Sequence, residues 1–130
     1  MEGIKGSIAA GWAWSAAAGA TAALAAVLAK LASPVVRWEY RIISYAGVIT
    51  CNVIMWSCYV RSLKALSSLQ ATVVNFAVNF ILTGFLGLIC FGETLHLEWF
   101  IGAFFIVFGI FVLSKAGVPN KDSTMTTKEE

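Results

Sequence analysis

Four apolar segments, each long enough to cross a lipid bilayer as a helix, occupy nearly the whole chain. The hydrocarbon core of a bilayer is about 30 Å thick and takes roughly 20 residues of helix to cross. The segments run from about 7 to 31, 42 to 60, 69 to 91 and 97 to 114. Only 12% of the 130 residues are charged and 59% are hydrophobic, and a soluble domain needs more charged side chains to cover its surface. The sequence therefore predicts an all-α integral membrane protein, with a four-transmembrane-helix bundle in residues 1–114.

Polar and helix-breaking residues separate the four segments. Pro34 can end the first helix, and Arg37 and Arg41 can anchor the second at the lipid headgroups. Residues 61–68, "RSLKALSS", supply cations and then hydroxyls that can cap the third helix. Residues 115–130 are polar and lack aromatic side chains, so we expect a short disordered tail there.

The first apolar segment has an alternative interpretation, and the distribution of lysine and arginine predicts the orientation in the membrane. A cleaved signal peptide is the other reading of residues 7–31, although the apolar stretch exceeds the usual length of a signal core. Four spans place both termini on one side of the membrane. That side collects Lys5, Arg61, Lys64, Lys115, Lys121 and Lys128, and the other side holds Lys30, Arg37 and Arg41. The excess of cations predicts that both termini are cytoplasmic.

Small residues recur on one face of the first and fourth segments. Gly11, Ser15 and Gly19 follow at four-residue spacing, and Gly102 and Gly109 lie seven apart. In lipid, small residues let helix backbones approach closely. Packing within one chain and a dimer interface both explain these faces.

Polar side chains form faces on the second and third segments. The third segment carries a stripe of Ser68, Thr72, Asn75, Asn79 and Thr83, and the second carries Tyr45, Asn52, Trp56 and Tyr59. An amide is costly in lipid and should face protein or water. The two faces could line a cleft for a small amphipathic solute, or Asn52 could simply pair with Asn75 or Asn79. Lys30 either extends to the membrane surface from the end of the first helix or faces a substrate.

Several functional classes lack support in the sequence. We expect no buried acidic residue in the four spans, which disfavours proton-driven pumping. No Walker loop, nucleophile elbow or metal cluster is present, so we predict no enzyme activity, cofactor or metal. The three cysteines fall in apolar runs without C-x-x-C spacing, and a net charge of +2 is too slight to indicate nucleic-acid binding.

The stretch "CFGETLHLEW", residues 90–99, is interpreted as a corner between the third and fourth segments. Gly92 can end one helix, Thr94 can help to start the next, and Glu98 suits that helix's first turn. His96, the single histidine, is interpreted as a solvated loop residue.

Residues 63–113, "LKALSSLQATVVNFAVNFILTGFLGLICFGETLHLEWFIGAFFIVFGIFVL", resemble the closing half of an EamA domain of the drug/metabolite transporter superfamily. The matching features are a polar helix, a corner at Gly92 and Glu93, and a last helix with spaced glycines. "AAVLAKLAS" also resembles the end of that family's first helix, with its lysine at Lys30. Within the superfamily the chain is most similar to the eukaryotic transmembrane protein 42 group.

The four-helix count is also similar to that of small multidrug resistance subunits, which work as dimers. Those carry a proton-coupling glutamate eight residues before the lysine, where this chain has Ala22. The resemblance therefore does not imply multidrug–proton antiport. Typical EamA transporters carry two repeats, so the resemblance implies that a site between repeats would need a second chain or a partner.

Two functional hypotheses follow. One is a dimeric carrier of a small organic solute, with Lys30, Asn52, Trp56, Asn75 and Asn79 as the candidate lining. The other is a non-transporting membrane protein that assembles with or regulates a partner. The expected partners are the lipid bilayer and either a second copy or another membrane protein.

Overall fold

The computed structural model describes residues 2–32 and 37–116, and these form four helices and no strand. The helices are α1 (Glu2–Leu31), α2 (Trp38–Ser62), α3 (Ser68–Phe91) and α4 (Leu97–Lys115). All four are long and apolar enough to cross a membrane. The predicted all-α, four-span fold is confirmed. Pro34 and the tail beyond residue 116 lie outside the described residues.

Two helices begin earlier than the sequence indicated. α1 begins at Glu2 rather than near residue 7, and α2 begins at Trp38 rather than near residue 42. A charged residue ends an apolar stretch of sequence but does not end a helix. Glu39 lies in the first turn of α2, where the helix dipole favours an acid. The helices therefore extend past the apolar segments at these ends.

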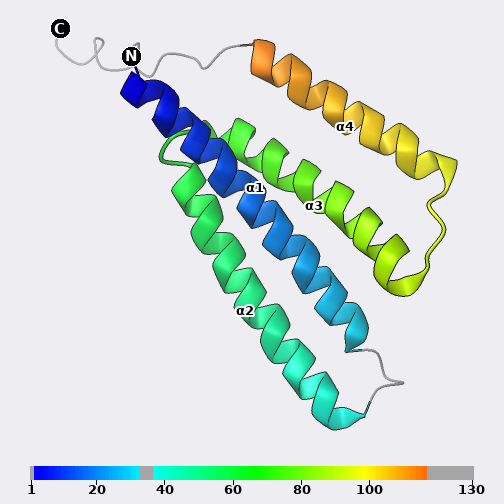
Figure 1. Ribbon diagram of the computed structural model, residues 1–130. Coiled ribbons are helices and arrows are strands. Elements are labelled where there is room, and N and C mark those ends of the chain that lie inside the picture. The colour runs from blue at the N-terminus through cyan, green and yellow to red at the C-terminus, as the bar shows by residue number, and fades with distance from the viewer. Residues whose placement is uncertain (1, 33–36, 117–130) are drawn as a thin grey trace, which may run out of the picture.

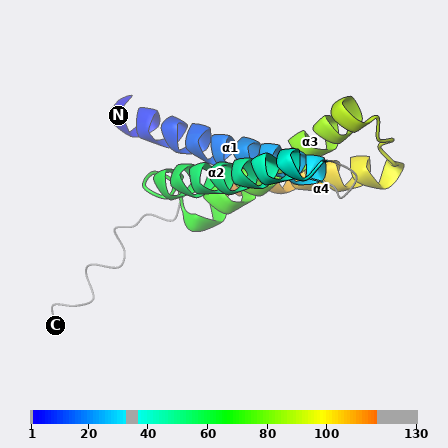
Figure 2. The ribbon, with the colours of Figure 1, turned by 90° about the horizontal axis from the view of Figure 1, so that it is seen from below.

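α1 lies between α2 and α3 and packs along both, while α4 contacts only α3 (Figure 1). α3 and α4 run antiparallel and are joined by the corner of residues 92–96. Seen from below, the helices form a shallow layer and the α3–α4 corner projects at one end (Figure 2). The bundle is thus three packed helices and a fourth that packs on α3 alone.

The core of the three packed helices consists of small side chains. Its most buried apolar members are mainly alanines, and the largest fully buried side chains are the serines Ser15 and Ser62. A Cβ on Gly47 of α2 would lie 2.9 Å from the side chain of Leu28 of α1, so Leu28 packs where Gly47 lacks a side chain. Close approach through small residues is how helices associate in lipid.

The ends of α3 follow the expected capping chemistry. The Ser67 hydroxyl accepts a hydrogen bond from the Gln70 amide and the Gln70 side chain accepts one from the Ser67 amide, which completes a capping box. At the other end Gly92 has a φ of 64°, in the left-handed region that favours glycine. The expected role of Thr94 differs, because the residue that precedes α4 is His96, whose side chain makes no capping bond.

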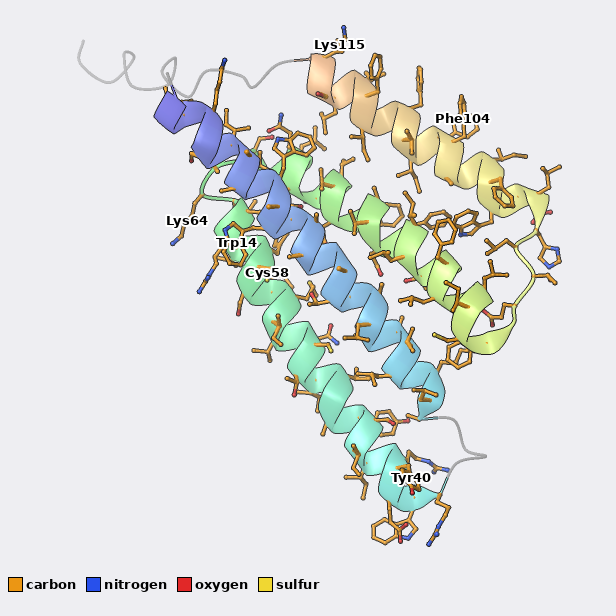
Figure 3. The ribbon with its side chains drawn as sticks, in the orientation of Figure 1. Trp14, Tyr40, Cys58, Lys64, Phe104 and Lys115 are labelled. Carbon is orange, nitrogen blue, oxygen red and sulfur yellow. The ribbon has the colours of Figure 1, made fainter. Side chains whose placement is uncertain are left out.

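Aromatic and cationic residues mark the two ends of the bundle. Trp38 and Tyr40 are exposed at the start of α2. At the opposite end the Arg61 guanidinium lies 4.8 Å from the ring centroid of Trp14, near Lys64 (Figure 3). Tryptophan, tyrosine and snorkelling cations are enriched where a membrane protein meets the headgroups. Their separation fits a bundle that spans the bilayer.

Candidate functional site

An open hollow lies between α3, the α3–α4 corner and the start of α4. Its volume is about 700 Å³, and it is open on one side. It is lined by Phe76, Asn79, Phe80, Thr83, Gly84, Glu93, Thr94, Leu95, His96 and Trp99. Volumes of about 300–1,000 Å³ are typical of sites for small molecules.

Trp99 forms the aromatic wall of this hollow. Its ring stacks on Phe80 with centroids 5.6 Å apart, and it meets Phe85 edge-on at 5.9 Å. A Cβ on Gly84 would lie 2.5 Å from the indole, so the missing side chain at Gly84 provides the seat for this ring. The start of α4 therefore packs on α3 through the contact between Trp99 and Gly84.

Glu93 is aimed back at α3 by the turn at Gly92. The Gly92 amide donates to the carbonyl of Leu88 at 3.0 Å, and the Glu93 amide donates to the carbonyl of Gly87 at 3.3 Å. A Cβ on Gly87 would lie 2.5 Å from a carboxylate oxygen of Glu93. The carboxylate thus rests on the α3 backbone, where only glycine leaves room.

This carboxylate forms an ion pair with Lys30 at the end of α1. The Lys30 ammonium also lies 4.3 Å from the ring centroid of Phe91. Both charged side chains are about half exposed, at 45% for Lys30 and 51% for Glu93. The pair ties α1 to the α3–α4 corner.

A second, smaller hollow of about 50 Å³ lies between α1 and α3 beside the ion pair. Its lining consists of Ala26, Val27, Lys30, Thr83, Gly87, Phe91 and Glu93. Thr83 and Glu93 line both hollows, whereas Lys30 lines only the smaller one. Glu93 therefore stands between Lys30 and the larger hollow.

The predicted lining residues are placed in different surroundings. Asn79 lines the larger hollow and Lys30 the smaller one. Asn52 is exposed on α2 and donates to the carbonyl of Val48 in its own helix at 2.8 Å, rather than to an asparagine of α3. Trp56 is also exposed on α2. The structure thus brings neither α2 residue into the two hollows.

The polar stripe of α3 serves more than one neighbour. Thr72 lies 2.8 Å from the Tyr59 hydroxyl of α2, and Thr83 donates to the Asn79 side chain at 3.1 Å. Asn75 lies where α3 meets α1, and its side-chain oxygen is buried without a hydrogen-bond partner among the described residues. The stripe therefore packs against α1 and α2 at its beginning and lines the hollow farther along.

The small-residue face of α1 packs against α3 and the loop that precedes it in the same chain. Gly11 is buried against Leu66, and Ser15 donates to the carbonyl of Ala71 at 2.5 Å. A Cβ on Gly19 would lie 2.5 Å from the carbonyl oxygen of Asn75. Of the two explanations for this face, the structure shows packing within one chain.

The glycines of α4 lie in more open surroundings. A Cβ on Gly102 would lie 3.6 Å from Phe80, and one on Gly109 would meet nothing within 4 Å. α4 has no buried residue, and Phe104 is directed away from α3 (Figure 3). This helix offers its surface to lipid or to another protein.

Sequence reasoning missed the partners that assemble the site. It singled out Lys30 and Glu93 separately, although they lie 63 residues apart and form one ion pair. It also passed over the aromatic wall of Phe80 and Trp99, since aromatics in apolar helices carry no distinctive pattern. The sequence signal that could have suggested this ion pair is that Glu93 and Lys30 both belong to the motifs that resemble the EamA domain.

Comparison with known families agrees with the resemblance read from the sequence. The EamA-like transporter family matches residues 2–115, which include all four helices. No solved structure matches the chain. With four apolar helices long enough to span a membrane and a family match over nearly its whole length, the chain belongs to the EamA-like transporter family.

Proposed function

We propose that this protein is a carrier subunit that moves a small amphipathic organic solute through the larger hollow. The observation that carries the proposal is the composition of that hollow. It combines the aromatic wall of Phe80 and Trp99 with hydrogen-bonding groups of Asn79 and Thr83. An apolar lining with a few convergent polar groups is characteristic of small-molecule sites.

The position of the hollow also suits transport. It runs from Phe76, near the middle of α3, to the corner at one end of the helix. From Phe76 to the end of α3 the helix rises about 22 Å, at roughly 1.5 Å per residue. The hollow therefore extends from mid-membrane depth toward one interface. A water-accessible hollow that touches the asparagine stripe favours a carrier over a helix-packing role for Asn79.

A second copy of the chain is proposed to complete the path. The hollow is bounded by α3, the corner and α4, and its remaining side is open. EamA transporters typically place a site between two repeats, and this chain has one set of four helices. The exposed surface of α4 would then contribute to the contact between copies.

The proposal carries three finer assignments. Transport would be exchange or facilitated diffusion, because no acidic residue lies in the middle of a span. Both termini would be cytoplasmic, which the excess of lysine and arginine on that side supports. The chain would belong to the transmembrane protein 42 group, which the similar length supports.

A non-transporting role in membrane assembly is the second candidate. It is favoured by the polar groups that only join helices, such as Ser15 with Ala71 and Tyr59 with Thr72. In that case the hollow would be filled by lipid or by a side chain of a partner.

Reconstitution in liposomes separates the two candidates. We would purify the protein, measure its oligomeric state, and screen uptake of labelled amphipathic metabolites against empty vesicles. Asn79→Leu places an apolar side chain in the hollow and should abolish uptake. Asn52→Leu is the matched control, because Asn52 lies outside both hollows, and it should transport normally. A monomeric protein with no flux above empty vesicles would refute the carrier proposal.

A further inference from the structure

We propose that Lys30 is an internal competitor for Glu93, and that the hollow prefers aromatic solutes with an ammonium group that takes over this carboxylate. This inference rests on the proposed function, since it names the chemical class of solute for the same hollow. It also assigns the ion pair a role in binding, in which solute and Lys30 contend for one carboxylate.

The first support is the position of the carboxylate. Glu93 lines both hollows, whereas the Lys30 ammonium lies on the side of the smaller one. A solute in the larger hollow therefore meets the carboxylate before the ammonium. One oxygen of Glu93 pairs with Lys30 and the other lies over Gly87. A carboxylate can accept hydrogen bonds on both oxygens, so a second cation can approach while Lys30 is still bound.

The second support is the chemistry of the remaining walls. Phe76, Phe80 and Trp99 present rings, and the face of an aromatic ring attracts a cation. Asn79 and Thr83 add oxygen acceptors to the same lining as Glu93. Among the residues that the structure describes, the lining of this hollow includes no lysine or arginine. Rings, acceptors and one carboxylate together suit an ammonium attached to an aromatic body.

The third support is that the ion pair can exchange. Both of its side chains are about half exposed, at 45% and 51%. Exposed ion pairs are weak, and one ammonium can replace another without leaving the carboxylate uncompensated. Once released, Lys30 can extend its stem and place the ammonium at the headgroups. Binding would thereby free the end of α1 from the α3–α4 corner.

Equilibrium binding with three matched probes tests this inference. The full-length protein in nanodiscs would be dialysed against radiolabelled phenylethylammonium, neutral phenylethanol and anionic 3-phenylpropionate. The expected order places phenylethylammonium first. Glu93→Gln should remove its advantage over phenylethanol. Lys30→Met should tighten phenylethylammonium binding by up to about fivefold, the factor equivalent to one exposed ion pair.

Two substitutions of the same kinds serve as controls. Lys115→Met removes a lysine at the far end of α4, and Glu98→Gln removes an acid outside both hollow linings. Both variants should bind all three probes as the native protein does. Gly87→Ala keeps every charge but displaces the carboxylate, so it should weaken phenylethylammonium binding without changing phenylethanol binding.

The remaining outcomes of these measurements would each contradict the proposed competition between Lys30 and the solute. Equal affinity for the ammonium and the alcohol, or weaker ammonium binding in Lys30→Met, would overturn the competition. A preference for 3-phenylpropionate that Lys30→Met abolishes would assign the anion site to Lys30 instead. If the protein carries other solutes in the uptake screen but binds no aromatic ammonium, the inference fails and the carrier proposal stands. If no solute is carried, the proposed function itself fails.

Discussion

Adding one methyl group at Gly19 should separate α1 from α3. The Cβ of Gly19→Ala would lie 2.5 Å from the Asn75 carbonyl oxygen and 3.0 Å from the Asn79 amide nitrogen. Both are backbone atoms, so no side-chain rotation relieves the clash. Restoring an ordinary separation of 3.4 Å requires a movement of about 0.9 Å, the difference between 3.4 and 2.5 Å.

That movement affects a buried hydrogen bond one turn away. The bond from Ser15 to the Ala71 carbonyl is 2.5 Å long and would lengthen toward 3.4 Å. Overpacking costs about 1–3 kcal/mol and a weakened hydrogen bond about 0.5–1.5 kcal/mol, against a gain of about 1 kcal/mol from the helix preference of alanine. We expect a net loss of about 1–3 kcal/mol in the free energy of unfolding.

The assay is unfolding of the purified protein in mixed micelles with rising mole fractions of dodecyl sulfate, followed by far-ultraviolet circular dichroism. Gly6→Ala on the same helix is the control, because a Cβ there meets nothing within 4 Å. It should be neutral or up to about 1 kcal/mol more stable. If Gly19→Ala proves as stable as Gly6→Ala, then α1 and α3 do not approach at this point as the structure describes.

Four further substitutions probe other parts of the fold. Ser67→Ala removes the α3 cap and should lower the free energy of unfolding in the same assay by about 0.5–2 kcal/mol; no change would argue against the capping box. Gly84→Ala would place a Cβ 2.5 Å from the Trp99 indole, so it should displace the ring and shift tryptophan emission, and an unaltered spectrum would argue against that seat. A Cβ on Gly109 would meet nothing within 4 Å among the described residues, so Gly109→Leu should weaken self-association, as measured by cross-linking and light scattering, without lowering the free energy of unfolding. Gly102→Leu should do the same although its side chain would meet Phe80, and an intact dimer in both variants would exclude this face of α4 from the dimer interface.

The sequence predicted the parts of the fold that depend on local chemistry. Apolar length specifies the number of spans, and hydroxyl and glycine caps placed the two ends of α3 near Ser67 and Gly92. The starts of α1 and α2 were predicted too late in the chain. A charged residue at the membrane surface ends the apolar stretch of sequence, but the backbone hydrogen bonds of the helix continue past it. Local signals are therefore reliable where one residue type decides the backbone conformation.

Helix pairing depends on information that periodicity lacks. Ser15 and Gly19 pack against α3 and Gly11 against the loop before it, whereas a Cβ on Gly109, on an equally regular face, would meet nothing within 4 Å among the described residues. Periodicity shows which residues share a face, and the identity of the neighbour depends on how the helices are arranged in space. Asn52 illustrates the same limit, because its amide is satisfied by the Val48 carbonyl of its own helix and needs no partner on α3.

The Gly-Glu corner depends on residues from two distant parts of the chain. Gly92 must adopt a left-handed conformation to aim Glu93 back along α3, and Gly87 must lack a side chain to receive the carboxylate. Lys30 then compensates the charge from the end of α1. Replacing Gly92 with a bulky residue would alter the direction of the carboxylate even though the charge is retained. The position of the Glu93 carboxylate therefore depends on Gly87 and Lys30 as much as on Gly92 and Glu93 themselves.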